Sequence, residues 1–142
     1  MNSRERVAIE AECTRLINDF VWYADTSDYE KTIALFMPDC TFGYDGGTLY
    51  QGHDGLRTLF GMLAANQRKS VHITTNVLVD VIDEDNAESK AYSKIFFKDD
   101  PGAGPLAPFT IMRFDCRFSR ADGNWRASQW RTRFDFRTSA RV

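Results

Sequence analysis

The sequence predicts an α+β fold in which three N-terminal helices cover one face of a curved, mainly antiparallel sheet. Apolar residues recur at helical spacing up to about residue 65, and from residue 71 onward they alternate with polar residues. The chain has 142 residues, of which 43% are hydrophobic. This is enough for one domain with a core and a pocket, so we expect residues 1–142 to form a single domain.

The first sixty-odd residues predict the three helices. In residues 5–24, one helical face carries Ile9, Cys13, Leu16, Ile17, Phe20 and Ala24. A second helix is expected to begin at Ser27-Asp28-Tyr29-Glu30, which fits a capping box, and to end at Pro38. The third opens at Gly52-His53-Asp54-Gly55, and its apolar residues are Leu56, Leu59, Phe60 and Leu63.

Two short strands, 40–44 and 48–51, are expected around the turn Asp45-Gly46-Gly47. Alternating patterns then predict long strands at 71–82, 87–98, 109–118 and 125–136. Residues 99–108 contain three prolines and two glycines and predict a loop. Helices followed by antiparallel strands give the α+β assignment.

Charge and composition exclude several classes of protein. The net charge of −2 and the pI near 5.7 are not those of a nucleic-acid-binding protein. The sequence has no apolar run of the length that a membrane span needs, and the charged N-terminus is not a signal peptide. The three cysteines form no CxxC pair, so reduced thiols and a cytoplasmic location are expected.

Two polar residues are candidates for catalysis. His72 lies on a strand face with Thr74, Asn76 and Leu78, a mixture that suits a pocket wall with a few polar groups. A histidine exposed at a strand end, or hydrogen-bonded in the core, fits the same pattern. Asp25 lies at a helix–helix corner, where either Asp25 or Asp28 can also cap a helix.

The remaining polar residues add weaker candidates. Tyr44 precedes a turn, as half-buried packing tyrosines often do. The arginines after residue 110 are expected on a solvated or subunit-facing sheet surface, with Arg133 or Arg131 as the candidate to line the pocket. Two histidines 19 residues apart, without a cysteine pair, give no ligand set, so no metal and no cofactor are expected.

Three blocks of the sequence together resemble the SnoaL-like branch of the nuclear transport factor two-like superfamily. They are YADTSDYEKTIALFMPDCTF after the first helix, LYQGHDGLRTLF, and the sheet with VHITTNVLVDV and DGNWR. The resemblance covers nearly the whole chain and implies a cone-like fold around a pocket. The branch includes scytalone dehydratase, hexachlorocyclohexane dehydrochlorinase and bile-acid dehydratase, which use an Asp–His pair.

The resemblance also implies roles for individual residues. Asp25 and His72 match the catalytic pair, and Tyr44 matches a substrate-polarising tyrosine. Two departures from scytalone dehydratase are Ala24, where that enzyme has a tyrosine, and the lack of a histidine in 109–118. A cofactor-independent lyase acting next to a carbonyl of a small hydrophobic substrate is therefore expected. The alternatives are a double-bond isomerase, or a non-catalytic binding module or dioxygenase β-subunit-like protein.

Further expectations concern the substrate and the partners. The residues expected to contact substrate, besides the three catalytic candidates, are Phe20, Tyr23, Asn76, Met112, Phe114 and Arg133. The only other partner expected is the chain itself. The aromatic and arginine content of 109–136 predicts a homo-oligomer, a dimer or a trimer, formed through the exposed face of the sheet.

Overall fold

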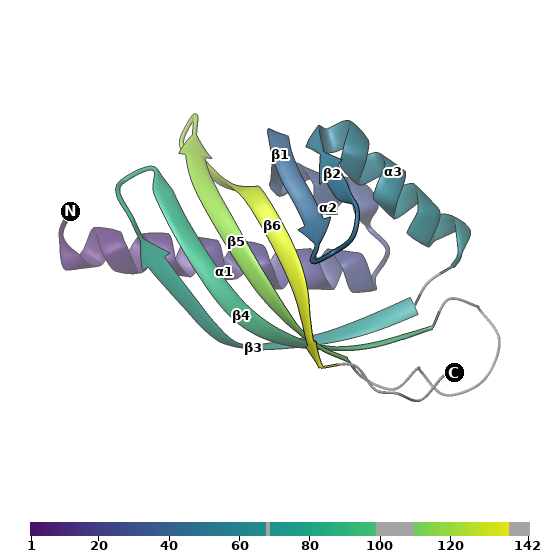
Figure 1. Cartoon of the computed structure of the whole chain (residues 1–142). Coiled ribbons are helices and arrows are strands. Elements are labelled where there is room, and N and C mark those ends of the chain that lie inside the picture. The colour runs from purple at the N-terminus through teal and green to yellow at the C-terminus, as the bar shows by residue number, and fades with distance from the viewer. Residues whose placement is uncertain (68, 99–109, 137–142) are drawn as a thin grey trace.

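The computed structural model describes residues 1–67, 69–98 and 110–136, and confirms the α+β fold (Figure 1). The helices are α1 (Ser3–Asp25), α2 (Tyr29–Ala34) and α3 (Gly52–Ala65). The strands are β1 (Phe36–Tyr44), β2 (Leu49–Gln51), β3 (Lys69–Val81), β4 (Asn86–Lys98), β5 (Thr110–Ala121) and β6 (Asn124–Phe136). The predicted loop at 99–108, residue Phe109 and residues 137–142 lie outside the described residues.

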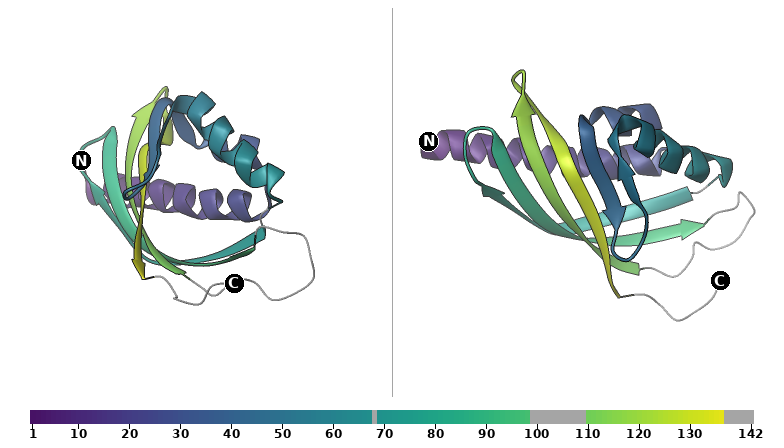
Figure 2. Two further views of the ribbon diagram at one scale, coloured as in Figure 1. Left: turned by 45° about the vertical axis from the view of Figure 1, so that its right-hand side comes forward. Right: turned by 45° about the horizontal axis from the view of Figure 1, so that its top comes forward.

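One mixed sheet contains all six strands, in the order β2-β1-β6-β5-β4-β3. Every neighbouring pair is antiparallel except β1 and β6, which run parallel. The sheet curves, with α1 and α3 on its concave side (Figure 2). The core forms between this concave face and the helices, and its largest fully buried side chains include Trp130, Phe36 and Phe114.

The second helix is shorter than the sequence predicted, because β1 begins before Pro38. The helix ends at Ala34, and Phe36 already belongs to β1. Between Phe36 and Thr41 the register of β1 against β6 is interrupted. Pro38 lacks an N–H donor and is tolerated in a strand at such an irregularity. The prediction that Pro38 ends the helix is therefore wrong. Pro38 lies in the irregular part of strand β1.

The predicted capping box at Ser27 is wrong by one residue. Ser27 has a φ of 59°, outside the extended range that an N-cap residue typically adopts. The N-cap of α2 is Asp28, whose carboxylate accepts a hydrogen bond from the backbone N–H of Lys31. The capping role that the sequence left open between Asp25 and Asp28 therefore belongs to Asp28.

Strand β3 contains a bulge that the alternating pattern did not predict. Its register against β4 shifts between Thr75 and Leu78, and Asn76 has a φ of 54°. Before the bulge, His72 faces inward and Val71 is exposed; after it, Val77 packs on the core. The prediction that Asn76 shares a face with His72 is therefore wrong, because the extra residue reverses the alternation.

Two further observations concern cysteines and membranes. Cys13, Cys40 and Cys116 are free and buried, and burial, the largest influence, raises the pKa of the Cys13 thiol to about 12. Thiols held in this form are poor nucleophiles. In the part of the chain that the structure describes, no helix combines the length and the apolar character required to cross a membrane.

Candidate functional site

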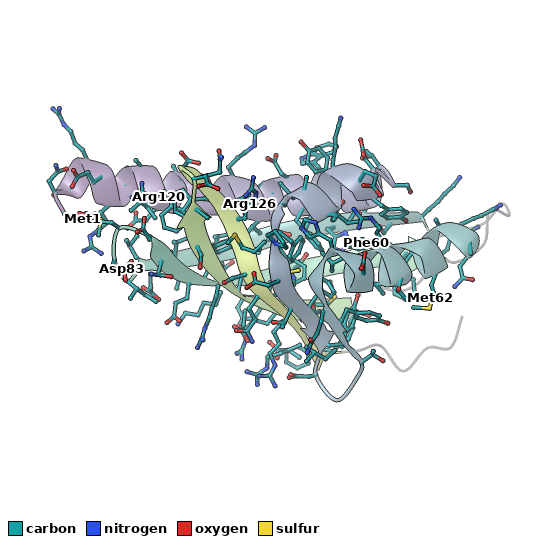
Figure 3. The ribbon with its side chains drawn as sticks, turned by 90° about the horizontal axis from the view of Figure 1, so that it is seen from above. Met1, Phe60, Met62, Asp83, Arg120 and Arg126 are labelled. Atoms are coloured by element: carbon teal, nitrogen blue, oxygen red, sulfur yellow. The ribbon has the colours of Figure 1, made fainter. Side chains whose placement is uncertain are left out.

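A cavity of about 320 Å³ lies between the three helices and the concave face of the sheet. This volume falls at the lower end of the range for small-molecule sites, about 300–1,000 Å³. Phe60, one of the residues that line the cavity, projects from α3. Asp83 and Arg120 lie at the opposite end of the molecule, near Met1 (Figure 3). Eight aromatic side chains line the cavity: Phe20, Tyr29, Phe42, Tyr44, Phe60, Phe97, Phe114 and Phe134.

Apart from the imidazole of His72, the rest of the described lining is uncharged. Ala24, Leu63, Ile95 and Met112 add apolar surface. The polar side chains, besides the two tyrosines, are Ser70, His72, Thr110 and Thr132. Among the described lining residues there is no lysine, arginine, aspartate or glutamate. Such a wall favours an uncharged, largely apolar ligand, because an unpaired charge is costly to bury.

Asp25 and His72 meet at one side of this cavity. The Nδ1 atom of His72 lies 2.6 Å from Oδ1 of Asp25, and the backbone N–H of His72 donates to Oδ2 at 2.8 Å. Both side chains are largely buried, with 9% of His72 and 15% of Asp25 exposed. His72 lines the cavity and Asp25 does not. The carboxylate thus lies behind the imidazole, as an orienting partner would.

The carboxylate of Asp25 stays ionised although it is largely buried. Burial is the largest influence and raises its pKa, but hydrogen bonds from His72 and Ser70 and the nearby imidazole together lower it below its ordinary value of 3.8. An ionised carboxylate only accepts hydrogen bonds, so Nδ1 of His72 carries the hydrogen. This leaves Nε2 as the acceptor nitrogen of the neutral ring, on an imidazole that lines the cavity.

Tyr44 lies at the end of β1 and lines the same cavity. Its ring stacks on Phe134 at 6.0 Å with 12° between the planes, and meets the edge of Phe42 at 5.6 Å. These contacts fix the ring and limit where its hydroxyl can reach. All three residues of the expected catalytic set therefore face or adjoin one cavity.

The structure divides the expected substrate contacts into two groups. Phe20, Met112 and Phe114 line the cavity. Tyr23, Asn76 and Arg133 do not. Tyr23 is half-buried on α1 with the Lys31 ammonium 5.7 Å from its ring, and Asn76 is exposed at the bulge of β3.

Arg133 was wrongly expected in the pocket, because the alternation of β6 turns it outward. Its Nε lies 3.0 Å from Asp45 on the outer face of the sheet, while its neighbours Thr132 and Phe134 face the cavity. Arg131, the other arginine considered, pairs with the same Asp45 at 2.8 Å.

The sequence did not reveal two polar residues of the cavity, Ser70 and Thr132. The Ser70 hydroxyl donates to Oδ1 of Asp25 at 2.7 Å, the same oxygen that contacts His72. Ser70 lies two residues before His72 on β3 and therefore shares its strand face, which is the signal that could have pointed to it. Thr132 lies between Arg131 and Arg133 in the sequence. If these arginines face outward on a strand, Thr132 must face inward, so the alternation could have pointed to it.

His53, the second histidine, has a different environment. Its Nε2 lies 2.9 Å from the backbone carbonyl of Phe36, which ties the start of α3 to β1. In the described part of the chain, no group of three or more His, Cys, Asp or Glu side chains is placed to hold a metal ion.

Solved structures share the fold of this chain at low sequence identity. A provisionally assigned scytalone dehydratase from Novosphingobium aromaticivorans DSM 12444 is 18% identical, with a TM-score of 0.88 over 99% of this chain and 93% of that one. Hexachlorocyclohexane dehydrochlorinase LinA-type3 from Novosphingobium barchaimii LL02 is 17% identical, with a TM-score of 0.81 over 95% and 92%.

A third structure is of a protein of unknown function from Mycobacterium tuberculosis, with asparagine in place of one aspartate. It is 25% identical, with a TM-score of 0.82 over 98% of this chain and 79% of that one. No curated protein matches the sequence. The model of the SnoaL-like domain matches residues 5–131, which is most of the chain. The chain therefore belongs to the SnoaL-like domain family.

Proposed function

We propose that this protein is a cofactor-independent lyase that eliminates water, or another leaving group, next to a carbonyl of a small, uncharged, hydrophobic substrate. One observation carries the proposal: the contact of 2.6 Å between His72 and a carboxylate outside the cavity, with the imidazole itself in the cavity wall. Structures of the same fold that are described as a dehydratase and a dehydrochlorinase are consistent with this reaction class.

In the proposed reaction, Nε2 of neutral His72 removes the proton from the carbon next to the carbonyl. Asp25 holds the ring in the Nδ1–H tautomer and stabilises the imidazolium that forms. The electron pair of the C–H bond moves toward the carbonyl oxygen, where the Tyr44 hydroxyl donates a hydrogen bond. The imidazolium then returns the proton to the departing hydroxyl as the carbon–oxygen bond breaks, so water leaves and an enone remains.

The test uses cyclic β-hydroxy ketones of one to three rings, with formation of the enone followed by its absorbance. Wild-type protein is expected to turn over at least one of them, and His72→Ala to reduce that rate to the uncatalysed one. His53→Gln is the matched control, because it alters the only other histidine and keeps an N–H donor for the Phe36 carbonyl. Equal loss in both variants, or unchanged turnover in His72→Ala, would contradict the proposal.

The same panel separates the proposal from its alternatives. A double-bond isomerase would move an enone double bond without releasing water, which proton NMR of the product distinguishes. A binding module would retain the ketones without turning any of them over.

We also propose that the protein forms a homo-oligomer through the outer face of the sheet. Exposed apolar side chains lie there on β3 and β4, with 54% of Ile73 and 44% of Tyr92 exposed. Light scattering is expected to give a dimer or trimer at about micromolar concentration, in the affinity range of specific interfaces. A monomer at that concentration contradicts this assembly.

A further inference from the structure

The cavity contains a second polar position, Thr132, on β6. The residue is only 2% exposed, yet it lines the cavity. Its hydroxyl has no hydrogen-bond partner among the described residues. The oxygen is also not sealed inside the protein, as Ser89 Oγ and Trp130 Nε1 are. A buried hydroxyl in a cavity wall, with no partner among the described residues, is available for a ligand.

The strand register places Thr132 away from His72. Thr132 pairs with Tyr44 on one side and Phe114 on the other, whereas His72 lies on β3 beside Ile95 of β4. The intervening strands β4 and β5 make the separation three interstrand steps of about 4.8 Å along the sheet. The sheet itself curves (Figure 2), and both residues line the cavity, so the two polar positions lie on separate strands of its wall.

We infer that Thr132 binds an uncharged oxygen of the ligand, a hydroxyl, ether or second carbonyl, remote from the group that His72 acts on. The described lining residues carry no lysine or arginine to balance a carboxylate or phosphate. A threonine hydroxyl both donates and accepts, so it serves any of these neutral oxygens. The surrounding aromatic rings favour a flat ring system between the two polar positions.

The inference rests on the proposed function only for the carbonyl end of the ligand. Its test therefore measures binding and stability, not turnover. The probes are 2-tetralone, its four ring-hydroxylated isomers and a carboxylated analogue, titrated by calorimetry. Wild-type protein is expected to bind at least one hydroxylated isomer about 3- to 10-fold more tightly than 2-tetralone, the effect of one hydrogen bond. The carboxylate is expected to bind more weakly than 2-tetralone.

Thr132→Val keeps the volume and removes the hydroxyl. It is expected to abolish the preference for the hydroxylated probe and leave the affinity for 2-tetralone unchanged, whereas Thr132→Ser retains the preference. Thr74→Val is the matched control: Thr74 also lies on an inward strand face, where it is half-buried, but its hydroxyl contacts Ser93 Oγ at 3.0 Å. It is expected to leave the preference intact.

Melting temperatures test the inference without any ligand. Because the Thr132 hydroxyl has no described partner, Thr132→Val is expected to melt at or above the wild-type temperature, while Thr74→Val, which orphans Ser93, melts below it. A lower melting temperature or loss of folding in Thr132→Val shows that the hydroxyl is paired within the protein, and overturns the inference.

Three binding results also overturn it. They are no measurable binding of any tetralone, no wild-type preference for a hydroxylated isomer, and an unchanged preference in Thr132→Val. Loss of the preference in a protein without lyase activity would uphold the Thr132 site and refute the proposed function. Lyase activity of the wild type, together with an unchanged preference in Thr132→Val, would uphold the proposed function and refute the Thr132 site.

Discussion

The inner and outer faces of β5 and β6 differ completely in chemistry although they belong to the same strands. Inward, Met112, Phe114 and Thr132 are almost fully buried and line a cavity. Outward, Arg113 and Asp115 form an ion pair in contact with solvent. Electrostatic interactions are strong where water is excluded and weak where it is not. Single polar changes on the inner side should therefore have large effects, and those on the outer side small ones.

The largest effect is expected at the Asp25–His72 pair. Asp25→Asn keeps the size of the side chain but favours the wrong histidine tautomer, so turnover should fall on the order of 10³–10⁴-fold. His72→Ala should lose at least as much. Because the two residues act as a unit in the proposed reaction, the double variant should be little worse than either single one. Full activity of Asp25→Asn would remove the carboxylate from the mechanism.

A smaller effect is expected at Tyr44, which in the proposed reaction donates one hydrogen bond to the developing enolate. Tyr44→Phe keeps the ring that stacks on Phe134. It should lower kcat on the order of 10–1000-fold, with little change in melting temperature. Tyr29→Phe is a useful comparison, because Tyr29 lines the same cavity and stacks on Phe60. Equal losses in both variants would show that neither hydroxyl has a special role.

The stability of the protein should depend on Asp25 at acid pH. The pKa of Asp25 is lower in the folded protein than its ordinary value of 3.8, so the ionised form favours folding. This contribution is fully present above the unfolded pKa and is lost as the pH falls through the folded pKa. Urea unfolding from about pH 6 down to about pH 2 should show this loss in wild type and a weaker one in Asp25→Asn.

Ser70→Ala sharpens this measurement, because it removes one of the donors that lower the pKa of Asp25. The total loss of stability should then be smaller than in wild type and should be complete at a higher pH, because the folded pKa lies closer to the unfolded one. An unchanged acid transition in Ser70→Ala would show that the hydrogen bonds from His72 suffice to keep the carboxylate ionised.

The smallest effect is expected on the outer face. Asp45→Ala removes the acceptor of both Arg131 and Arg133, two pairs at 2.8 and 3.0 Å. These side chains are between 34% and 59% exposed, so the free energy of unfolding should fall by less than about 1 kcal/mol. The difference should shrink further in high salt. A loss as large as that caused by a buried-core substitution would contradict the contrast between the faces.

The sequence predicted the inner face of β5 well and that of β3 poorly. Alternation from Thr110 to Phe118 continues in the structure, because β5 has neighbours on both sides that fix its register. On the edge strand β3, the bulge at Asn76 reverses the alternation. No residue pattern predicts such a bulge. A positive φ is only one of several backbone conformations that asparagine can adopt, so an asparagine in a strand does not by itself indicate a bulge. Asn76 was therefore misplaced, whereas His72, which precedes the bulge, was not.

The sequence by itself determined the order and type of the helices and strands, because each follows from local periodicity and turn residues. It also suggested Asp25, His72 and Tyr44 as candidates for the catalytic site, through the resemblance of three segments to a known family. Only the tertiary structure decided that Ser70 bonds the Asp25 carboxylate, that Thr132 faces the cavity without a described partner, and that Arg133 turns outward. These outcomes depend on which strands become neighbours and where the sheet bends, which no local pattern encodes.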